Sequence, residues 1–445
     1  MRITLLLLFL LLNSASLVAQ DEVTLEYSDL GHSISNRFTI YESEKDISIE
    51  EFLEKKDGLK GVKLTNSVEN LDFTSKVFFI HFKLHNSSHF ISDLILETGR
   101  PITNIVELRN ISTNTLQRSG DAIPFKNKSY QSNNCAFICE AHFGPSHEFV
   151  LKLKSDGEII SLPITFHEVG AFNKLEQKRQ FNLGLFYGIF LFVILIYLTF
   201  YILIRDPLYL IYSCYVVFSG LLQFSLDGYM HKYVFTSGGY FTQHSVLFIA
   251  GWTVLFALTY AKWYLKIEGR LKKTTHIFSI LVLIATFGSL IPGTIYEISY
   301  PLINAFSLLS LVFLIYAGIK TRRQQKGTSR LFLIGIISLF GGAVIFILGN
   351  FSIIDFPELT QNSLKAGSMI EIICLSILMA SKYKSLQDEK EAVQKQLMVQ
   401  LEETNIQLEL EVTERTKEIE SQKIQLKEKN EDFIASIKYA ERIQN

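Results

Sequence analysis

The sequence of 445 residues is poor in charge, in proline and in cysteine. Charged residues make up 20% of it, below the roughly 25% of ordinary soluble domains, whereas 48% of the residues are hydrophobic. The 43 Lys and Arg balance the 44 Asp and Glu, so there is no basic excess for nucleic acid. Eight prolines beside 35 Phe and 19 Tyr exclude a mainly disordered or collagen-like chain, and four cysteines exclude a small disulfide-rich scaffold. The composition therefore indicates a membrane protein with polar parts.

Residues 1–20 contain the three parts of a secretory signal peptide. Arg2 supplies a positive charge, residues 5–12 form a short apolar core, and Ala19 lies at the expected cleavage site. The apolar core is shorter than the about 20 residues that a spanning helix needs, which disfavours the alternative of an uncleaved signal anchor. We therefore expect the residues that follow to be exported.

Residues 21–175 predict an all-β domain on the exported side of the membrane. Short runs of β-branched and aromatic residues recur there, separated by turn residues. In the run 77–84, alternate residues from Phe78 to Leu84 are apolar and would share one face of a strand, because side chains alternate across it. This pattern favours a jelly-roll-like β-sandwich, for which about 155 residues suffice.

Cys135 and Cys139 lie four residues apart in one of these predicted strands. Their Cα atoms would then be about 13 Å apart, too far for a disulfide bond unless the chain bends there. No His lies at a ligand spacing that would favour a metal site. We expect free or buried thiols.

Seven apolar stretches follow within residues 176–383. Each has about 18 to 22 residues, which matches the hydrocarbon thickness of a bilayer at 1.5 Å per residue. Backbone polar groups in lipid must be satisfied within the segment, so these stretches can only be helices. The predicted spans are residues 182–203, 208–228, 245–264, 276–295, 302–319, 331–349 and 364–381.

The distribution of Lys and Arg predicts the direction of the spans. If the β-domain is exported, the loops after the first, third and fifth spans face the cytoplasm, and most of the basic residues between the spans lie in these loops. The outward loops carry only Lys232 and Lys365. This positive-inside bias predicts a multi-pass protein of the inner (cytoplasmic) membrane with a cytoplasmic C-terminus.

Glu371 is the acid that lies deepest within a predicted span, about one-third of the way through the seventh. An intramembrane carboxylate costs roughly 2.5 kcal/mol or more, so it usually faces the bundle interior and has a partner. Glu371 is either a transmembrane coupling element or a structural group bonded to a Tyr or Ser of a neighbouring helix. A transporter or channel with an accessory ectodomain is the weaker alternative, because the spans lack a chain of such groups.

Residues 384–445 predict a long cytoplasmic signalling helix. No proline follows Pro357 and no glycine follows Gly367, so the last span can continue into a segment rich in Glu, Lys, Gln and Leu. Heptad spacing of apolar residues predicts a parallel homodimeric coiled coil, against the alternative of a solvated single helix. The residues of the predicted seam are Leu401, Leu408, Val412, Ile419, Leu426 and Phe433.

Motifs of catalytic proteins are missing from the sequence. It contains no Gly-rich phosphate loop, no paired-Asp metal site and no His-Glu-x-x-His motif, and no His follows His276. We therefore expect no catalytic residues, no cofactor and no metal site, and no enzymatic activity in this chain.

Several short motifs occur in an order known from one bacterial family. They lie at residues 77–86, 119–125, 162–164, 184–189, 205–212, 367–371 and 375–380. Over about residues 30–385 the chain resembles the seven-transmembrane receptors with diverse intracellular signalling modules. The resemblance implies a jelly-roll-like sensor domain that binds carbohydrates or other small ligands, a seven-helix domain, and a helical connector to an output module.

Residues 436–444 are similar to the segment that precedes sporulation-type, metal-dependent serine phosphatases in Bacteroidota receptors of this family. The phosphatase itself is missing from the sequence. The resemblance therefore implies an output module that was lost by truncation, or a cytoplasmic signalling protein, such as a phosphatase, supplied by a separate or neighbouring gene.

Overall fold

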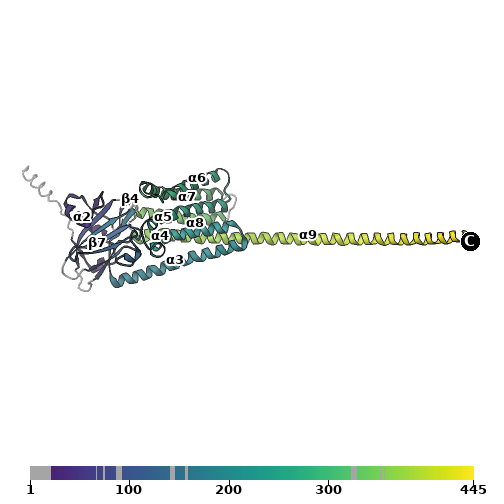
Figure 1. Ribbon diagram of the computed structural model, residues 1–445, viewed down its shortest axis with the longest axis horizontal. Coiled ribbons are helices and arrows are strands. Elements are labelled where there is room, and N and C mark those ends of the chain that lie inside the picture. The colour runs from purple at the N-terminus through teal and green to yellow at the C-terminus, as the bar shows by residue number, and fades with distance from the viewer. Residues whose placement is uncertain are drawn as a thin grey trace, which may run out of the picture. The chain divides into compact units, whose positions relative to one another are not determined.

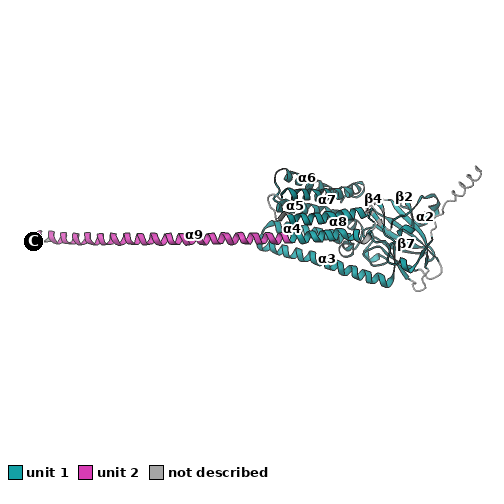
Figure 2. Ribbon diagram, turned by 180° about the vertical axis from the view of Figure 1, so that it is seen from behind, with its two compact units in different colours: residues 1–376 teal, residues 377–445 magenta. Residues whose placement is uncertain are grey.

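The computed structural model describes residues 22–66, 68–73, 76–86, 93–140, 146–155, 159–321, 328–350, 353–354 and 356–444. The predicted signal peptide, residues 1–20, lies outside the described residues. The chain divides into two compact units, residues 1–376 and residues 377–445, which are coloured separately in Figure 2.

Three β-sheets form the N-terminal part of the first unit (Figure 1). The seven-stranded sheet contains β1 (Glu22–Leu25), β2 (Thr39–Ser43), β3 (Gly61–Lys63), β5 (Val77–Asn86), β7 (Ile105–Asn110), β8 (Thr115–Ser119) and β10 (His147–Lys154). Its order is β3-β2-β5-β10-β7-β8, with β1 parallel to β5 and the other pairs antiparallel. The smaller antiparallel sheets are β12-β6-β9, from Thr165–Glu168, Asp93–Glu97 and Ala136–Glu140, and β11-β4, from Ile159–Leu162 and Glu69–Phe73.

The hydrophobic core of this part is built by alternate residues of facing strands. The residues of β5 from Phe78 to Leu84 that share one face are all buried, in one cluster with Leu96 of β6 and Phe166 of β12. Burying each such side chain stabilises the fold by about 1.5 to 3 kcal/mol. The predicted β-sandwich and the predicted inward face of β5 are therefore confirmed.

A short helix, α2 (Ile49–Lys55), covers the other face of β5. Ser48 caps this helix by accepting a hydrogen bond from the backbone N–H of Glu51. Phe52 of α2 stacks on Phe79 with ring centroids 4.4 Å apart. Because both of its faces are covered, β5 is buried almost along its whole length.

Cys139 of β9 and Cys135, the residue directly before this strand, are free thiols in the hydrophobic core. Cys135 and Cys139 are both fully buried, and burial raises the pKa of both thiols. β9 pairs regularly with β6 from Ala136 to Glu140, so the chain has no bend that would bring the two sulfur atoms together. The expected free, buried thiols are confirmed.

Seven helices of the described chain are long and apolar enough to cross a membrane, as predicted. They are α3 (Val169–Ile204), α4 (Pro207–Leu226), α5 (Tyr240–Tyr264), α6 (Gly269–Gly288), α7 (Thr294–Thr321), α8 (Thr328–Asn350) and α9 (Pro357–Gln444). The short helices are η1 (Tyr27–Asp29), η2 (Ser35–Arg37), η3 (Lys56–Gly58), η4 (Phe125–Asn127) and the π-helical turn η5 (Met230–Val234).

One predicted span crosses the turn between two helices. The fourth span was predicted to end at residue 295, but α6 ends at Gly288 and α7 begins at Thr294. That prediction was wrong because apolar residues continue across the turn around Pro292 and Gly293, where Gly293 has a φ of 84°. α3 begins at Val169, directly after β12, and contains residues 175 and 176, and the domain boundary between these residues remains a prediction.

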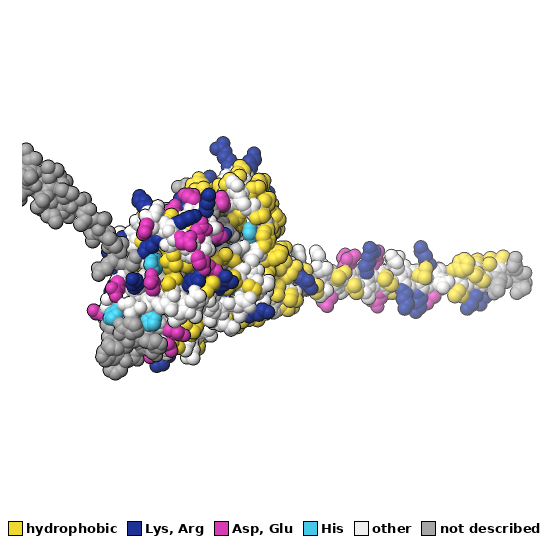
Figure 3. Space-filling model, turned by 60° about the vertical axis from the view of Figure 1, so that its left-hand side comes forward, with side chains coloured by type: hydrophobic (Ala, Val, Ile, Leu, Met, Phe, Trp, Pro, Cys, Tyr) yellow, Lys and Arg dark blue, Asp and Glu magenta, His cyan; other side chains and the backbone are white. Residues whose placement is uncertain are grey.

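The surface of the helical part is apolar. Large side chains that point away from the bundle include Phe192 and Ile284, which are 64% and 66% exposed. In Figure 3, hydrophobic side chains gather over the helical part, whereas charged side chains are frequent over the strands. Contiguous apolar surface of this kind is rare on soluble proteins and fits contact with lipid tails.

Candidate functional site

The candidate site is the set of polar contacts that hold α9 inside the first unit. At its centre, Glu371 of α9 is 1% exposed, and the hydroxyl of Tyr215 in α4 donates to its carboxylate. The Tyr215 oxygen lies 2.7 Å from Oε1 and 2.6 Å from Oε2. The structure thus supplies the tyrosine partner that the sequence suggested. The coupling role of Glu371 remains a prediction.

A second contact lies further along α9, at Ser376. The Tyr212 hydroxyl of α4 lies 3.0 Å from the Ser376 hydroxyl and donates to the carbonyl of Ile372 at 3.1 Å. The Tyr197 hydroxyl of α3 donates to the carbonyl of Ser376 at 2.6 Å. Backbone carbonyls of α9 therefore receive hydrogen bonds from two neighbouring helices, in addition to those within the helix.

A third contact holds the beginning of α9. The ammonium of Lys365 lies 2.6 Å from Oδ1 of Asp227, and the Tyr187 hydroxyl of α3 donates to Oδ2 at 2.5 Å. The Lys365 and Asp227 side chains are only 19% and 11% exposed. Asp227 is the C-cap of α4, and its backbone N–H bonds the carbonyl of Gln223.

These contacts place α4 and α9 in one antiparallel register. Asp227, Tyr215 and Tyr212 of the α4 segment meet Lys365, Glu371 and Ser376 of α9, so that residue numbers fall on one helix as they rise on the other. α9 is therefore fixed against α4 at its beginning, at Glu371 and at Ser376.

Helix α8 packs closely against α9, with glycines of both helices at the contact. A Cβ at Gly342 of α8 would lie 2.5 Å from the carbonyl oxygen of Ser363, and a Cβ at Gly367 of α9 would lie 2.7 Å from the carbonyl oxygen of Ser338. Small residues of this kind let helix backbones approach closely in membranes. Gly335 and Gly349 extend this seam at a spacing of seven residues, a sequence signal that could have predicted the packing.

Sequence reasoning suggested a Tyr or Ser partner for Glu371 but did not identify Tyr215, and it did not find the Asp227–Lys365 pair. Asp227 and Lys365 stand near the ends of predicted spans, where charged residues are ordinary. Tyr215 lies in an α4 that is rich in tyrosine, so no pattern distinguishes it from Tyr209 or Tyr212. Only the packing of α4 on α9 brings these groups together.

A second buried cluster joins the β-domain to α3. Glu97 of β6 is 3% exposed and accepts hydrogen bonds from Asn134 at 2.6 Å, His167 at 3.1 Å and Arg179 of α3 at 2.6 Å. Burial alone would raise the pKa of Glu97, but the His167 hydrogen bond and the Arg179 charge outweigh it and lower the pKa to about 2. The carboxylate therefore stays ionised near neutral pH and holds α3 on the sheet.

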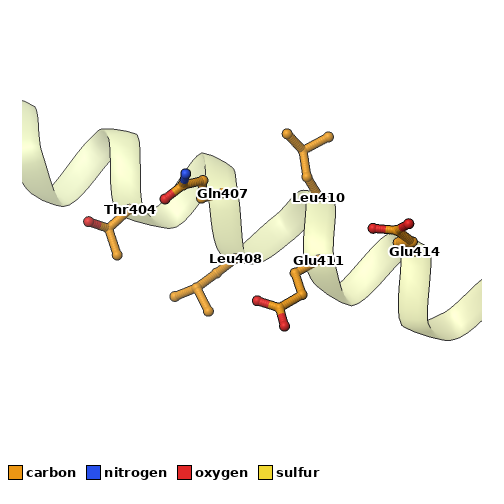
Figure 4. A pocket seen from close by; sticks show the side chains of 6 residues that line it. All are labelled: Thr404, Gln407, Leu408, Leu410, Glu411 and Glu414. Carbon is orange, nitrogen blue, oxygen red and sulfur yellow. The ribbon is translucent and has the colours of Figure 1, made fainter.

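The predicted seam residues lie on α9 in the second unit. All six are more than half exposed, from 53% at Leu408 to 70% at Leu426. A shallow pocket at Leu408 is lined only by side chains of the same helix, Thr404, Gln407, Leu408, Leu410, Glu411 and Glu414 (Figure 4). The described part of the chain therefore leaves the seam exposed, and pairing with a second copy remains a prediction.

The described ranges contain no group of three or more His, Cys, Asp or Glu residues that could hold a metal ion. The contacts of α9 described above join it to α3, α4 and α8.

Two family models match consecutive parts of the chain. Residues 35–168 match the family described as 7TMR-DISM extracellular 2, and residues 179–382 match the family described as 7TM diverse intracellular signalling. No curated protein matches the chain. The second match contains α4 and the polar contacts of α9 up to Ser376.

Replacing Glu371 tests whether its contact with Tyr215 stabilises the bundle. Glu371→Ala leaves a buried hydroxyl without its acceptor, and should lower the free energy of unfolding by about 1 to 3 kcal/mol. Glu371→Gln keeps an acceptor oxygen and should cost less. Unfolding of the full chain in mixed micelles measures both. Equal stability of Glu371→Ala and the parent would contradict the assignment.

The Glu97 cluster predicts a dependence of stability on pH. Because the folded pKa of Glu97, about 2, is below its ordinary value of 4.5, the cluster stabilises the protein above about pH 4.5. This contribution should disappear as the pH falls from 4.5 toward 2. Glu97→Gln should lower the melting temperature at pH 7 and flatten its decline in acid. Parallel acid profiles for the two proteins would refute this role.

Proposed function

Since the chain belongs to the seven-transmembrane receptors with diverse intracellular signalling modules, we propose that it senses a small extracytoplasmic ligand, such as a carbohydrate, and relays binding to a cytoplasmic output module. The β-sandwich would bind the ligand, and α9 would carry the signal. The family matches support the sensor role, whereas no motif or described pocket identifies the ligand.

The continuity of α9 is the observation that carries this proposal. The seventh span and the signalling helix are one helix, Pro357–Gln444, without a break between them. The polar contacts with α4 fix the register of its beginning, so a change in that register would move the whole helix. A ligand can produce such a change only if it binds the two registers with different affinity.

We further propose that two copies pair through the seam of α9. The exposed seam residues follow the heptad spacing of a two-stranded coiled coil. Both copies enter the same membrane in the same direction, so the coil would be parallel. The basic residues in the loops after the first, third and fifth spans support an inner-membrane location with this coil in the cytoplasm.

The proposed output is a cytoplasmic signalling protein that the coil recruits or controls. The similarity of residues 436–444 to the segment before serine phosphatases supports a phosphatase as this module. The coil would then change the arrangement of two phosphatase domains when the seventh span changes register.

Crosslinking tests the coil directly. In membranes, the variants Val412→Cys and Ile419→Cys should each form symmetric disulfide-linked dimers, because seam positions face each other in a parallel pair. Lys417→Cys is the matched control, since its position lies on the outer face and should crosslink far less. Equal yields at all three positions would argue against the seam.

The relay is tested by weakening the helix between span and coil. The full chain in nanodiscs is screened with soluble oligosaccharides, and an oligosaccharide that binds should change the crosslinking rate of Val412→Cys. The double substitution of Gln387 and Asp388 by Gly should abolish this change without affecting binding, because each Gly costs a helix about 1 kcal/mol. Ala at both positions is the control. A response that survives the glycines would contradict the relay.

A further inference from the structure

The loop between β8 and β9, residues 120–135, contacts the linker between α4 and α5, residues 227–239. We propose that this contact loop transmits the state of the ectodomain to α9, and that Asp227 is the positioning residue through which it acts. The inference rests on the proposed receptor function. It specifies the contacts through which a signal would pass from the β-sandwich to the seventh span.

The contact loop binds the linker mainly through backbone groups. The Phe125 N–H donates to the carbonyl of Thr236 at 2.9 Å, and the Gly239 N–H donates to the carbonyl of Asp121 at 3.2 Å. The ring of His231 lies with Nε2 2.8 Å from the carbonyl of Ile123. Burial lowers the pKa of His231 to about 4, so the ring is neutral near pH 7. Its one N–H is then on Nε2 and donates a hydrogen bond to the carbonyl of Ile123. The linker is thus bonded to the loop along most of its length.

Two glycines of the linker permit this close approach. Gly228 has a φ of +75°, and a Cβ there would lie 2.6 Å from Cβ of Pro101. Gly238 has a φ of +70°, and a Cβ there would overlap the carbonyl of Ile123. Both positions combine a left-handed backbone, which disfavours other residues, with no room for a side chain. The linker therefore fits the ectodomain at both of its ends.

A buried lysine gives the contact loop its shape. Lys128 is 4% exposed, and its ammonium donates to the carbonyls of Ser132, Asn133 and Asn134 at 2.6, 3.1 and 3.1 Å. Burial lowers the pKa of Lys128. Because the ammonium draws these carbonyls together, the peptide at Asn133 is held in place from inside the loop.

Asn133 connects the loop to the residue that holds α9. Its side-chain N–H donates to the carbonyl of Asp227 at 3.0 Å. The carboxylate of Asp227 binds Lys365 of α9 at 2.6 Å and Tyr187 of α3 at 2.5 Å. One residue therefore touches the ectodomain through its backbone and the seventh span through its side chain, and a displacement of the loop acts on Lys365 through Asp227.

Another attachment of the ectodomain joins the sheet to α3. Glu97 and Arg179 make this contact, and α3 ends at Ile204 after meeting α9 through the Tyr197 hydroxyl, which donates to the carbonyl of Ser376. The Asp227 contact instead holds the beginning of α9 through an ion pair with Lys365. α9 continues from the bundle into the second unit, so the Asp227 contact is placed to act on its first turns.

A double-mutant cycle tests the route with the full chain carrying Val412→Cys in membranes. Asn133→Ala and Lys365→Met should each change the crosslinking rate by roughly two- to tenfold, the effect expected for loss of one hydrogen bond. Because both act through Asp227, the double variant should resemble the stronger single variant. Lys365→Arg should restore the parent rate by keeping the ion pair. Gln131→Ala, at an exposed position of the same loop, is the control.

The outcomes separate this inference from the proposed function. Parent-like crosslinking in Asn133→Ala, with an altered rate in Lys365→Met, would overturn the role of the contact loop and leave the receptor function intact. Additive effects of the two substitutions would overturn the shared route through Asp227. Absence of seam crosslinking in the parent would instead refute the coil and thus the proposed function. Immunoblots of the membrane fraction confirm that each variant is inserted in equal amount.

Discussion

Glu371, a buried carboxylate of α9, requires a hydrogen-bond partner, and this requirement constrains the register of the helix in the bundle. A charged or polar group deep in the membrane is costly unless it is bonded, and the hydroxyl of Tyr215 donates its one proton to the carboxylate of Glu371. Shifting α9 by one residue would break this contact together with those at Lys365 and Ser376. The polar contacts of α9 therefore specify one register against α4 and make any other register energetically distinct.

Another side of α9 packs against α8. There, glycines bring the two backbones close together, as at Gly342 and Gly367, and side chains of α9 such as Thr360 pack against Gly349. The Ser363 hydroxyl of α9 also donates to the carbonyl of Gly342 at 3.0 Å. α9 is thus held by polar contacts with α3 and α4 and by close packing with a further hydrogen bond against α8, so all three neighbours contribute to its register.

Much of the fold could be predicted because it follows from local patterns. The period of two in β5, the spacing of the basic loops and the length of the apolar stretches are properties of short segments, and the sandwich and seven helices agree with them. The end of α6 was misjudged because hydropathy continues across the turn at Gly293. Of the polar contacts of α9, the sequence predicted only the position of Glu371. An acidic residue within an apolar stretch can be recognised in the sequence even when its partner is unknown.

The sequence by itself determined the class of structure, the seven spans and the continuity of α9, because each depends on residues that are close in the chain. Tertiary structure alone decided that Tyr215 faces Glu371, that Asp227 meets Lys365, and that Asn133 reaches Asp227 from the ectodomain. These partners are far apart in the chain, and neither their spacing nor their residue types predict a contact. Their pairing follows from how α4, α9 and the contact loop pack, which fixes distances that no local pattern encodes.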